Sequence, residues 1–415
     1  MATSALRKER PAPYEPEEAR AQAPAVQARR QTPGQETVPR KGLLTAGYMD
    51  YSLVLIVFFL AIFGLIMLFS TSSFEAELKF GTPAYYVKRQ LAASVFGVFV
   101  MLFLSYFPDY HVLEKLAVPA YVFSAGLIAL VLTPLGYEAN GARRWLEIKG
   151  VSIQPAEVAK LAMIVFLATL SCVMRDKLNT RKGVLVFMGS VLPVVLMIYK
   201  ITENLSSALI VLGIAFIMLF ISTPGYLRFV VLAAAGGLAA FGLIYYILNY
   251  SDPSQSVRFA RIFAWHDLES YASGKGYQTL QSLYAIGSGG VFGKGLGESI
   301  QKTGFIPEAQ NDMIFSIICE ELGLFGGIAV IIMFFMLLWR LMIIAQNAPD
   351  LFGALLVVGV LGHIAIQVIL NIAVVTNLIP NTGITLPFIS YGGSAVVMQM
   401  AEIGVVMNVA RRIRA

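Results

Sequence analysis

Ten separate blocks of this chain are almost free of charge, strongly apolar and close to twenty residues long. A transmembrane α-helix needs roughly 20 such residues to cross the hydrocarbon core of a bilayer. Lipid offers the backbone no hydrogen-bond partner, so only α-helices and closed barrels cross it, and these blocks are too long for barrel strands. We therefore expect an all-α polytopic membrane protein. The expected transmembrane helices are 52–69, 91–107, 116–135, 158–174, 183–199, 205–223, 229–250, 322–339, 351–375 and 394–410.

The composition excludes the other common classes of chain. Hydrophobic residues make up 57% of the sequence and charged residues 13%, whereas about a quarter of a typical soluble domain is charged. So much apolar surface also excludes disorder over the whole length. Two cysteines (Cys172, Cys319) and three scattered histidines (His111, His266, His363) favour neither a disulfide framework nor a metal centre. The basic residues form no long tract, so nucleic acid is not an expected partner.

The distribution of basic residues predicts the orientation in the membrane. An even number of spans places both termini on one side, together with the connection at 175–182. Lys and Arg are frequent in these segments, and cytoplasmic segments carry such an excess. We therefore expect a disordered cytoplasmic tail over 1–47 and a transmembrane domain over 48–415 with a cytoplasmic C-terminus. The C-terminal basic residues are Arg411, Arg412 and Arg414.

Two long connections, 136–157 and 251–311, are expected on the outer side. Loops of this length are uncommon in compact proteins and often carry function. Both contain cations near the expected membrane surface, which indicate either an anionic partner or ordinary solvated loop charges. These cations are Arg143, Arg144, Lys149, Arg258, Arg261, Lys275, Lys294 and Lys302.

The second outer loop contains the glycine-rich stretch GSGGVFGKGLG at 287–297. It lacks the glycine spacing, and the Ser or Thr after the lysine, that define a Walker A phosphate loop. Two interpretations stay open. Its backbone N–H groups and Lys294 cradle phosphate oxygens, or the stretch is a mobile loop that packs between helices.

Ionisable side chains at membrane depth are functional candidates, because they are unfavourable in lipid. Glu157 and Lys160 lie three residues apart on one face of the fourth span. They form a local ion pair, or Lys160 meets a carboxylate from another helix. Asp312 lies near the start of a helix expected to begin around Pro307. It acts either as a helix cap or as a partly desolvated base with a raised pKa.

Other polar residues in the apolar spans have structural explanations. For Glu320 and Glu321 we expect buried hydrogen bonds to neighbouring helices. For His363 in the ninth span we expect a satisfied position in the core. The sequence contains no HExxH pair, and its histidines are too isolated to argue for a Ser/His/Asp set.

Three stretches of the sequence resemble the SEDS family of membrane proteins (shape, elongation, division and sporulation). The ten-span layout and the large loop between spans seven and eight agree with this family over almost all of 48–415. The three stretches are 141–162, 304–327 and 381–395.

Within this family the chain is most similar to the division branch, FtsW, and less similar to the RodA and sporulation branches. The motif PEA at 307–309, the stretch 203–211 and the long N-terminal tail carry this preference. Gln310 and Asn311 stand where the family usually has His-Thr. Glu203 is the only carboxylate where it usually has an aspartate-containing turn.

The resemblance implies a peptidoglycan glycosyltransferase. Such an enzyme polymerises lipid II at the outer face of the cytoplasmic membrane during cell division and releases polyprenyl diphosphate. By resemblance, Asp312 is the general base and Lys160 is the lysine that faces it. The expected substrate-binding residues are Arg143, Arg144, Trp145, Gln154, Glu157, Lys294 and Ser390. Trp145 either stacks on a sugar or lies at the membrane interface. No dedicated metal site is expected, and a Mg²⁺ or Mn²⁺ ion that bridges Asp312 and the diphosphate stays an alternative.

Two other functions stay open. In the first, the chain is a flippase that moves lipid II across the membrane without making or breaking a bond. In the second, it is a septal scaffold that recruits a class B transpeptidase. The resemblance implies a class B penicillin-binding protein and divisome membrane proteins as partners. It also implies a place in the bacterial cytoplasmic membrane at the division septum.

Overall fold

The computed structural model describes residues 49–106, 109–139, 142–148, 150–225 and 227–413. The predicted tail over 1–47, Lys149 and Arg414 lie outside these residues.

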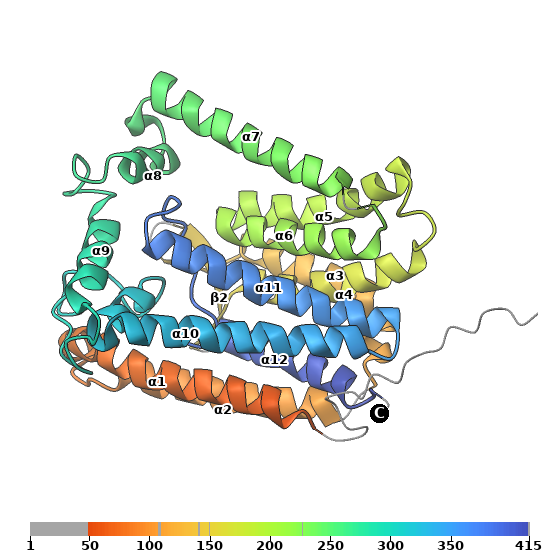
Figure 1. Cartoon of the computed structure of the whole chain (residues 1–415), viewed down its shortest axis with the longest axis horizontal. Helices are drawn as coiled ribbons and strands as arrows, with labels where there is room; N and C mark the ends of the chain where they lie inside the picture. Colours follow the sequence, from red (N-terminus) through yellow and green to blue (C-terminus); the bar gives the residue numbers. More distant parts are fainter. Residues whose placement is uncertain (1–48, 107–108, 140–141, 149, 226, 414–415) are drawn as a thin grey trace, which may run out of the picture. The chain divides into compact units, whose positions relative to one another are not determined.

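Ten helices of the described chain are long and apolar enough to cross a membrane, which confirms the predicted fold class. They alternate in direction, so the connections lie alternately at two ends of the bundle (Figure 1). Their bounds are α1 (Tyr51–Phe80), α2 (Tyr85–Tyr106), α3 (His111–Leu130), α4 (Pro155–Val173), α5 (Arg181–Ile201), α6 (Leu205–Ser222), α7 (Leu227–Tyr250), α10 (Ile314–Asn347), α11 (Leu351–Val375) and α12 (Gly393–Ala410).

Two helices are much longer than their apolar blocks. α1 has 30 residues and α10 has 34. For α10 the expected apolar span was 322–339, in a helix expected to begin near Pro307. The Glu320 and Glu321 carboxylates are buried and paired, so the helix runs through them. α10 is broken at Gly323, whose φ of 69° and ψ of −166° are open to glycine but strained for other residues.

The two long loops contain secondary structure that the sequence did not predict. The first forms an antiparallel sheet in the order β1-β2-β3. The second contains a 3₁₀ turn and two short helices, and Figure 1 shows α8 and α9 at the end of the bundle away from the C-terminus. We call this the loop end. The elements are β1 (Gly136–Ala139), β2 (Ala142–Ile148), β3 (Val151–Ile153), η1 (Pro253–Gln255), α8 (Val257–His266) and α9 (Tyr277–Gly289).

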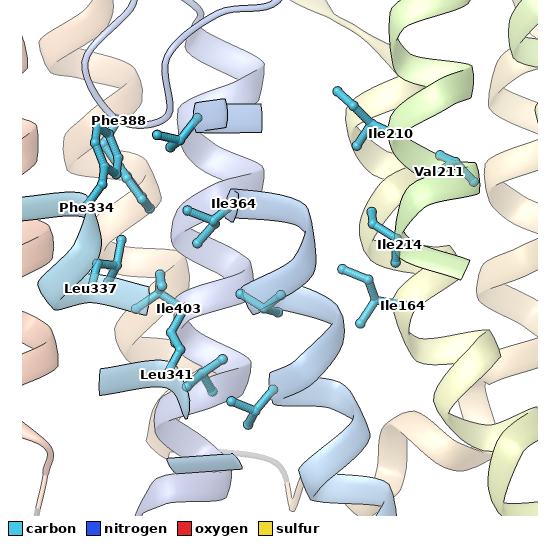
Figure 2. Packing of buried hydrophobic residues seen from close by; sticks show 14 of the residues in the cluster. Ile164, Ile210, Val211, Ile214, Phe334, Leu337, Leu341, Ile364, Phe388 and Ile403 are labelled. Carbon is cyan, nitrogen blue, oxygen red and sulfur yellow. The ribbon is translucent and has the colours of Figure 1, made fainter. Parts of the chain in front are cut away.

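The core lies between α4, α6, α10, α11 and α12. Figure 2 shows Ile164 of α4 near Ile214 of α6 on one side of α11, and Ile364 of α11 on the other side, together with Ile403 of α12. Gly359 lets α4 and α11 approach closely, since a Cβ there would lie 2.5 Å from Ile164 Cγ2. The polar residues of α4, α11 and α12 therefore face protein rather than lipid.

The glycine-rich stretch docks against the break in α10. The N–H groups of Lys294 and Gly295 donate to the carbonyls of Glu320 and Glu321, at 3.0 and 2.9 Å. Leu324 N–H donates back to Gly290 O at 2.9 Å. This geometry favours the interpretation of a loop packed between helices, because its backbone donors are already engaged.

Two buried carboxylates hold this loop in place. Lys294 Nζ lies 2.7 Å from Glu320 Oε1, and Lys302 Nζ lies 2.7 Å from Glu321 Oε1. Glu321 also accepts a hydrogen bond from Ser70 of α1. The expected structural role of Glu320 and Glu321 is confirmed. The predicted role of Lys294 as a phosphate ligand has a competing partner, because its ammonium is paired with Glu320.

Candidate functional site

Asp312 lies just before α10, in the last turn of the second long loop. The helix begins at Ile314, and its N-cap is Met313, which makes no side-chain capping bond. The interpretation of Asp312 as a helix cap is therefore wrong. The expected helix start near Pro307 is also wrong, because 301–313 folds as turns that bring Asp312 against other segments.

Two side chains from distant helices hold Asp312. Gln278 Nε2 of α9 donates to its Oδ1 at 3.3 Å, and Asn371 Nδ2 of α11 donates to its backbone carbonyl at 2.8 Å. Asn381, in the connection between α11 and α12, donates to Gln278 Oε1 at 3.2 Å. Three segments of the loop end thus meet at one carboxylate.

The surroundings of Asp312 raise its pKa. Burial raises this pKa from 3.8 to about 6, and the negative charge of Glu308 acts in the same direction. The positive charge of Arg261 and the hydrogen bond from Gln278 oppose the shift. A carboxylate with this pKa is ionised at neutral pH, yet it is more basic than an exposed aspartate. This combination suits a general base.

Three arginines lie on the α8 side of this carboxylate, and we call them the arginine cluster: Arg144, Arg258 and Arg261. Burial lowers the pKa of Arg144, and the positive charges of Arg261 and Arg258 lower it further, although Glu203 opposes them. The three guanidinium groups are therefore close enough to repel each other.

Neutral partners hold the arginine cluster in place. Arg144 donates to the carbonyls of Thr202 and Glu203, both at 3.3 Å. Arg258 donates to Tyr199 Oη at 2.6 Å, and Arg261 donates to Asn381 O at 3.4 Å. Within the described chain, none of the three arginines forms an ion pair with a carboxylate. The cluster thus keeps positive charge available to an anion.

The other residues predicted on the first long loop lie differently. Arg143 is exposed on β2, and its Nε lies 3.8 Å from Glu138 Oε2, as expected of a solvated loop charge. Trp145 is half-buried on β2, opposite Tyr137 of β1. Only Arg144 of this stretch joins the arginine cluster.

Glu157 and Lys160 form a local ion pair inside α4. Lys160 Nζ lies 2.8 Å from Glu157 Oε1, and 1% and 8% of the two side chains are exposed. No ion pair or hydrogen bond joins Lys160 to Asp312 in the described residues. The structure therefore favours the local pair over contact with a carboxylate of another helix.

Gln154 and Ser390 brace the same region through backbone contacts. Gln154 precedes α4, and its N–H lies 3.4 Å from Ser394 Oγ at the start of α12. Ser390 Oγ accepts a hydrogen bond from Leu386 N–H at 2.8 Å. Gln154 thus joins the start of α4 to the start of α12, whereas Ser390 braces the α11–α12 connection internally. Substrate binding by either residue stays a prediction.

Reasoning from the sequence missed Gln278, Asn371 and Asn381. Asn371 carries a usable signal, because a buried amide within an apolar span needs partners inside the protein. The other two carry no local signal. His363 is buried in the core and its Nδ1 lies 2.9 Å from Glu402 Oε2, but its Nε2 has no hydrogen-bond partner in the described residues, so the expected satisfied position is met only at one ring nitrogen.

No group of three or more His, Cys, Asp or Glu side chains in the described residues is arranged to hold a metal ion. Asp312 has Glu308 as a carboxylate neighbour. A requirement for Mg²⁺ or Mn²⁺ stays a prediction.

Comparisons with known proteins cover almost the whole described chain. A family model described as cell cycle protein, FTSW/RODA/SPOVE, matches residues 51–415. Stage V sporulation protein E of Bacillus subtilis is 40% identical over 364 residues, which span 87% of this chain and 97% of that protein. A probable peptidoglycan glycosyltransferase FtsW of Trichlorobacter lovleyi is 37% identical over 372 residues, which span 89% and 95%.

Solved structures agree with this relationship. A structure on the coordination of polymerization and crosslinking by a peptidoglycan synthase complex matches with a TM-score of 0.70 at 27% identity, over 88% of this chain and 98% of that chain. The crystal structure of the Thermus thermophilus rod shape determining protein RodA matches with a TM-score of 0.62 at 27% identity, over 88% and 98%. FtsW, RodA and a stage V sporulation protein thus all stand among the similar proteins.

Proposed function

The chain belongs to the FtsW/RodA/SpoVE (SEDS) family, and from this premise we propose that it is a peptidoglycan glycosyltransferase. It is a multi-pass membrane protein, with ten long apolar helices in the part of the chain that the structure describes. Its substrate in this proposal is lipid II, a disaccharide-pentapeptide on a polyprenyl diphosphate. The observation that carries the proposal is Asp312, a carboxylate of raised pKa next to the unpaired arginine cluster.

The reaction joins two lipid-linked sugars. The 4-hydroxyl of the acceptor sugar attacks the anomeric carbon of the donor, and the bond from that carbon to the diphosphate breaks. Asp312 takes the hydroxyl proton, and polyprenyl diphosphate leaves with the electron pair of the broken bond. General-base assistance of this kind contributes ~10²–10⁴-fold to a rate.

The arginine cluster supports the second half of this reaction. Negative charge grows on the leaving diphosphate, and preorganised cations at that position lower the barrier. In this proposal Arg144 binds the diphosphate, and Arg258 and Arg261 extend the positive surface beside it. Arg143 and Trp145 would contact the sugars from β2. Glu157 and Lys160 would support the floor of the site, and a Mg²⁺ or Mn²⁺ ion at the diphosphate would add further charge neutralisation.

The direct test is polymerisation of lipid II by purified protein. The protein and its cognate class B transpeptidase, in detergent, are supplied with lipid II, and glycan products are separated on a gel. Ladders of polymer are the expected result. Lipid II that crosses vesicle membranes without polymer would support the flippase alternative. Binding of the transpeptidase alone would support the scaffold alternative.

The membrane orientation and partners form the finer part of the proposal. We place the loop end outside the cell, where lipid II is polymerised, and both termini in the cytoplasm. A class B penicillin-binding protein and divisome membrane proteins at the septum are the proposed partners. The solved peptidoglycan synthase complex supports a partner of this kind. The 40% and 37% identities to sporulation and division proteins leave both cellular roles open.

Reporter fusions test this orientation. A reporter fused after Arg414 is expected to read cytoplasmic, and one inserted near Ser254 is expected to read external, because an odd number of spans separates the two positions. A fusion in the connection at 175–182 provides a cytoplasmic control. Equal readings at Arg414 and Ser254 would contradict the arrangement and the outer placement of Asp312.

Substitutions of the two neighbouring arginines test the arginine cluster. Arg144→Ala is expected to lower the polymerisation rate by ~10²-fold, the usual scale for loss of one oriented donor to developing charge. Arg144→Lys should recover only part of the rate, since an ammonium cannot present the planar donor pair of a guanidinium.

Arg143→Ala should have the smaller effect, because Arg143 is exposed and pairs with Glu138. Arg175→Ala, an exposed position at the opposite end of the bundle, serves as the control. A wild-type rate for Arg144→Ala would show that Arg144 does not assist the reaction and is an ordinary loop charge.

A further inference from the structure

Asn371 of α11 is a buried amide that donates two hydrogen bonds, one to Asp312 and one to Ile384 in the connection between α11 and α12. None of its surface is exposed. Its Nδ2 donates to Asp312 O at 2.8 Å and to Ile384 O at 2.7 Å. Its Oδ1 is buried without a hydrogen-bond partner in the described chain. Asn371 therefore contributes as a two-pronged donor and nothing else.

The two carboxylate oxygens of Asp312 lie in different surroundings. Oδ1 accepts a hydrogen bond from Gln278 Nε2 at 3.3 Å. No side chain in the described residues donates to Oδ2, which lies toward Gly383. A Cβ placed on Gly383 would lie 3.9 Å from Oδ2, with no other non-neighbouring atom of the described chain within 4 Å.

The space beside Gly383 is therefore the open approach to Asp312. Gly383 has a φ of +72°, a conformation that favours glycine, and it carries no side chain to fill this space. Ile384 is the next residue, so the carbonyl that Asn371 holds belongs to the same turn. The Asn371 amide thus holds the backbone carbonyl of Asp312 on one side of this space and the carbonyl of Ile384, in the glycine turn, on the other.

We propose that Asn371 is a positioning residue for glycosyl transfer, which ties Asp312 to the Gly383–Ile384 turn so that Oδ2 faces the acceptor hydroxyl between them. This inference rests on the proposed function. Asn371 does not touch the substrate in this arrangement and acts through Asp312. Displacement of a catalytic group by 1 Å can lower a rate by ~10²-fold, so loss of the two bonds should act mainly on the chemical step.

Gln367 provides a matched control on the same helix face. It lies one turn deeper, is 2% exposed, and donates through Nε2 to Thr385 O at 3.0 Å. Gln367→Leu thus removes a similarly buried amide, together with two hydrogen bonds to Thr385, the residue after Ile384. It leaves both bonds of Asn371 intact.

The experiment compares the full-length variants with the cognate transpeptidase, and measures lipid II polymerisation against substrate concentration and pH. For Asn371→Leu we expect kcat to fall by ~10²-fold with KM nearly unchanged. The midpoint of the pH–rate profile should move to lower pH, because a loosened carboxylate is better hydrated. Gln367→Leu should keep the wild-type midpoint and lose far less activity.

The charged groups that act on Asp312 are Arg261 of α8 and Glu308 of its own loop, and both variants leave them in place. Asn371→Ala carries no side-chain donor and serves if the leucine variant does not fold. It should show the same fall in kcat.

Three results would overturn the inference. Equal losses in Asn371→Leu and Gln367→Leu with an unchanged pH midpoint would assign Asn371 a structural role only. Wild-type kcat in a folded Asn371→Ala protein would show that the donors are not needed. Absence of polymer from the wild-type protein would instead remove the proposed function, and this inference with it.

Discussion

Asp312→Asn is expected to lower the lipid II polymerisation rate by ~10²–10⁴-fold, the scale for removal of a general base. The amide nearly preserves the size of the side chain and still accepts the bond from Gln278, but it takes no proton at neutral pH. The variant should insert into membranes and bind its transpeptidase normally. The measurement is initial polymerisation rate at saturating lipid II.

The pH dependence of the wild-type rate follows from the same carboxylate. The base works in its ionised form, and the Asp312 pKa is raised to about 6. The rate should therefore rise with pH through about 6 and level off above it, and this rise should be absent from any residual activity of Asp312→Asn. An exposed aspartate would place the rise near its ordinary pKa of about 3.9 instead.

A control and a metal titration complete this test. Asp252→Asn makes the same chemical change at an exposed carboxylate of the same loop, and it should leave the rate unchanged. A metal-ligand role would also be lost with asparagine, so the wild-type rate is titrated against Mg²⁺ and Mn²⁺. Full activity of Asp312→Asn would contradict both the general-base role and the metal-ligand role of Asp312. The flippase or scaffold function would then be favoured.

Lys160→Met is expected to destabilise the protein by about 3–5 kcal/mol, because it leaves the Glu157 carboxylate buried without its partner. The two side chains are 1% and 8% exposed, and the second Glu157 oxygen already lacks a hydrogen-bond partner in the described residues. Methionine fills most of the volume of lysine, so cavity formation contributes little. The measurement is thermal or denaturant unfolding of the purified protein.

The double variant Glu157→Gln/Lys160→Met separates stability from catalysis. It removes both charges, and replacement of a buried ion pair by neutral groups of similar volume is often neutral or stabilising. We expect its stability to return close to wild type. A folded double variant without polymerisation would support the catalytic role that the family resemblance implies for Lys160. Wild-type stability of Lys160→Met alone would contradict the buried pair.

The positions of the membrane helices could be predicted from the sequence because they follow from local composition. The span expected over 351–375 coincides with α11 (Leu351–Val375), and the seventh span, expected over 229–250, differs from α7 (Leu227–Tyr250) only at its start. Lipid imposes one requirement on every such block, internal hydrogen bonding over a fixed length, so the partners of a helix hardly alter its existence. Asp312 was also identifiable, by the resemblance of 304–327.

The course of α10 could not be predicted, because distant residues determine it. Glu320 and Glu321 were expected to be buried in a helix, but their partners Lys294 and Lys302 lie in the preceding loop and could not be identified from the sequence. The break at Gly323 is stabilised by the glycine-rich loop, whose Gly290 carbonyl accepts from Leu324 N–H at 2.9 Å. A charge is tolerated at depth only where such partners are present.

The sequence by itself thus determined the class of fold, the number of spans and the candidate carboxylate, since these depend on residue type along a short window. Only the tertiary structure decided what that carboxylate meets. Gln278 and Asn371 lie 34 and 59 residues from Asp312 in the chain. Likewise only the fold joined Arg144 to Arg258 and Arg261, and it favoured the local pair with Glu157 over the other predicted arrangement of Lys160. Hydrogen bonds and charge effects fall off over a few ångströms, so they depend on helix packing, which no local pattern of residues records.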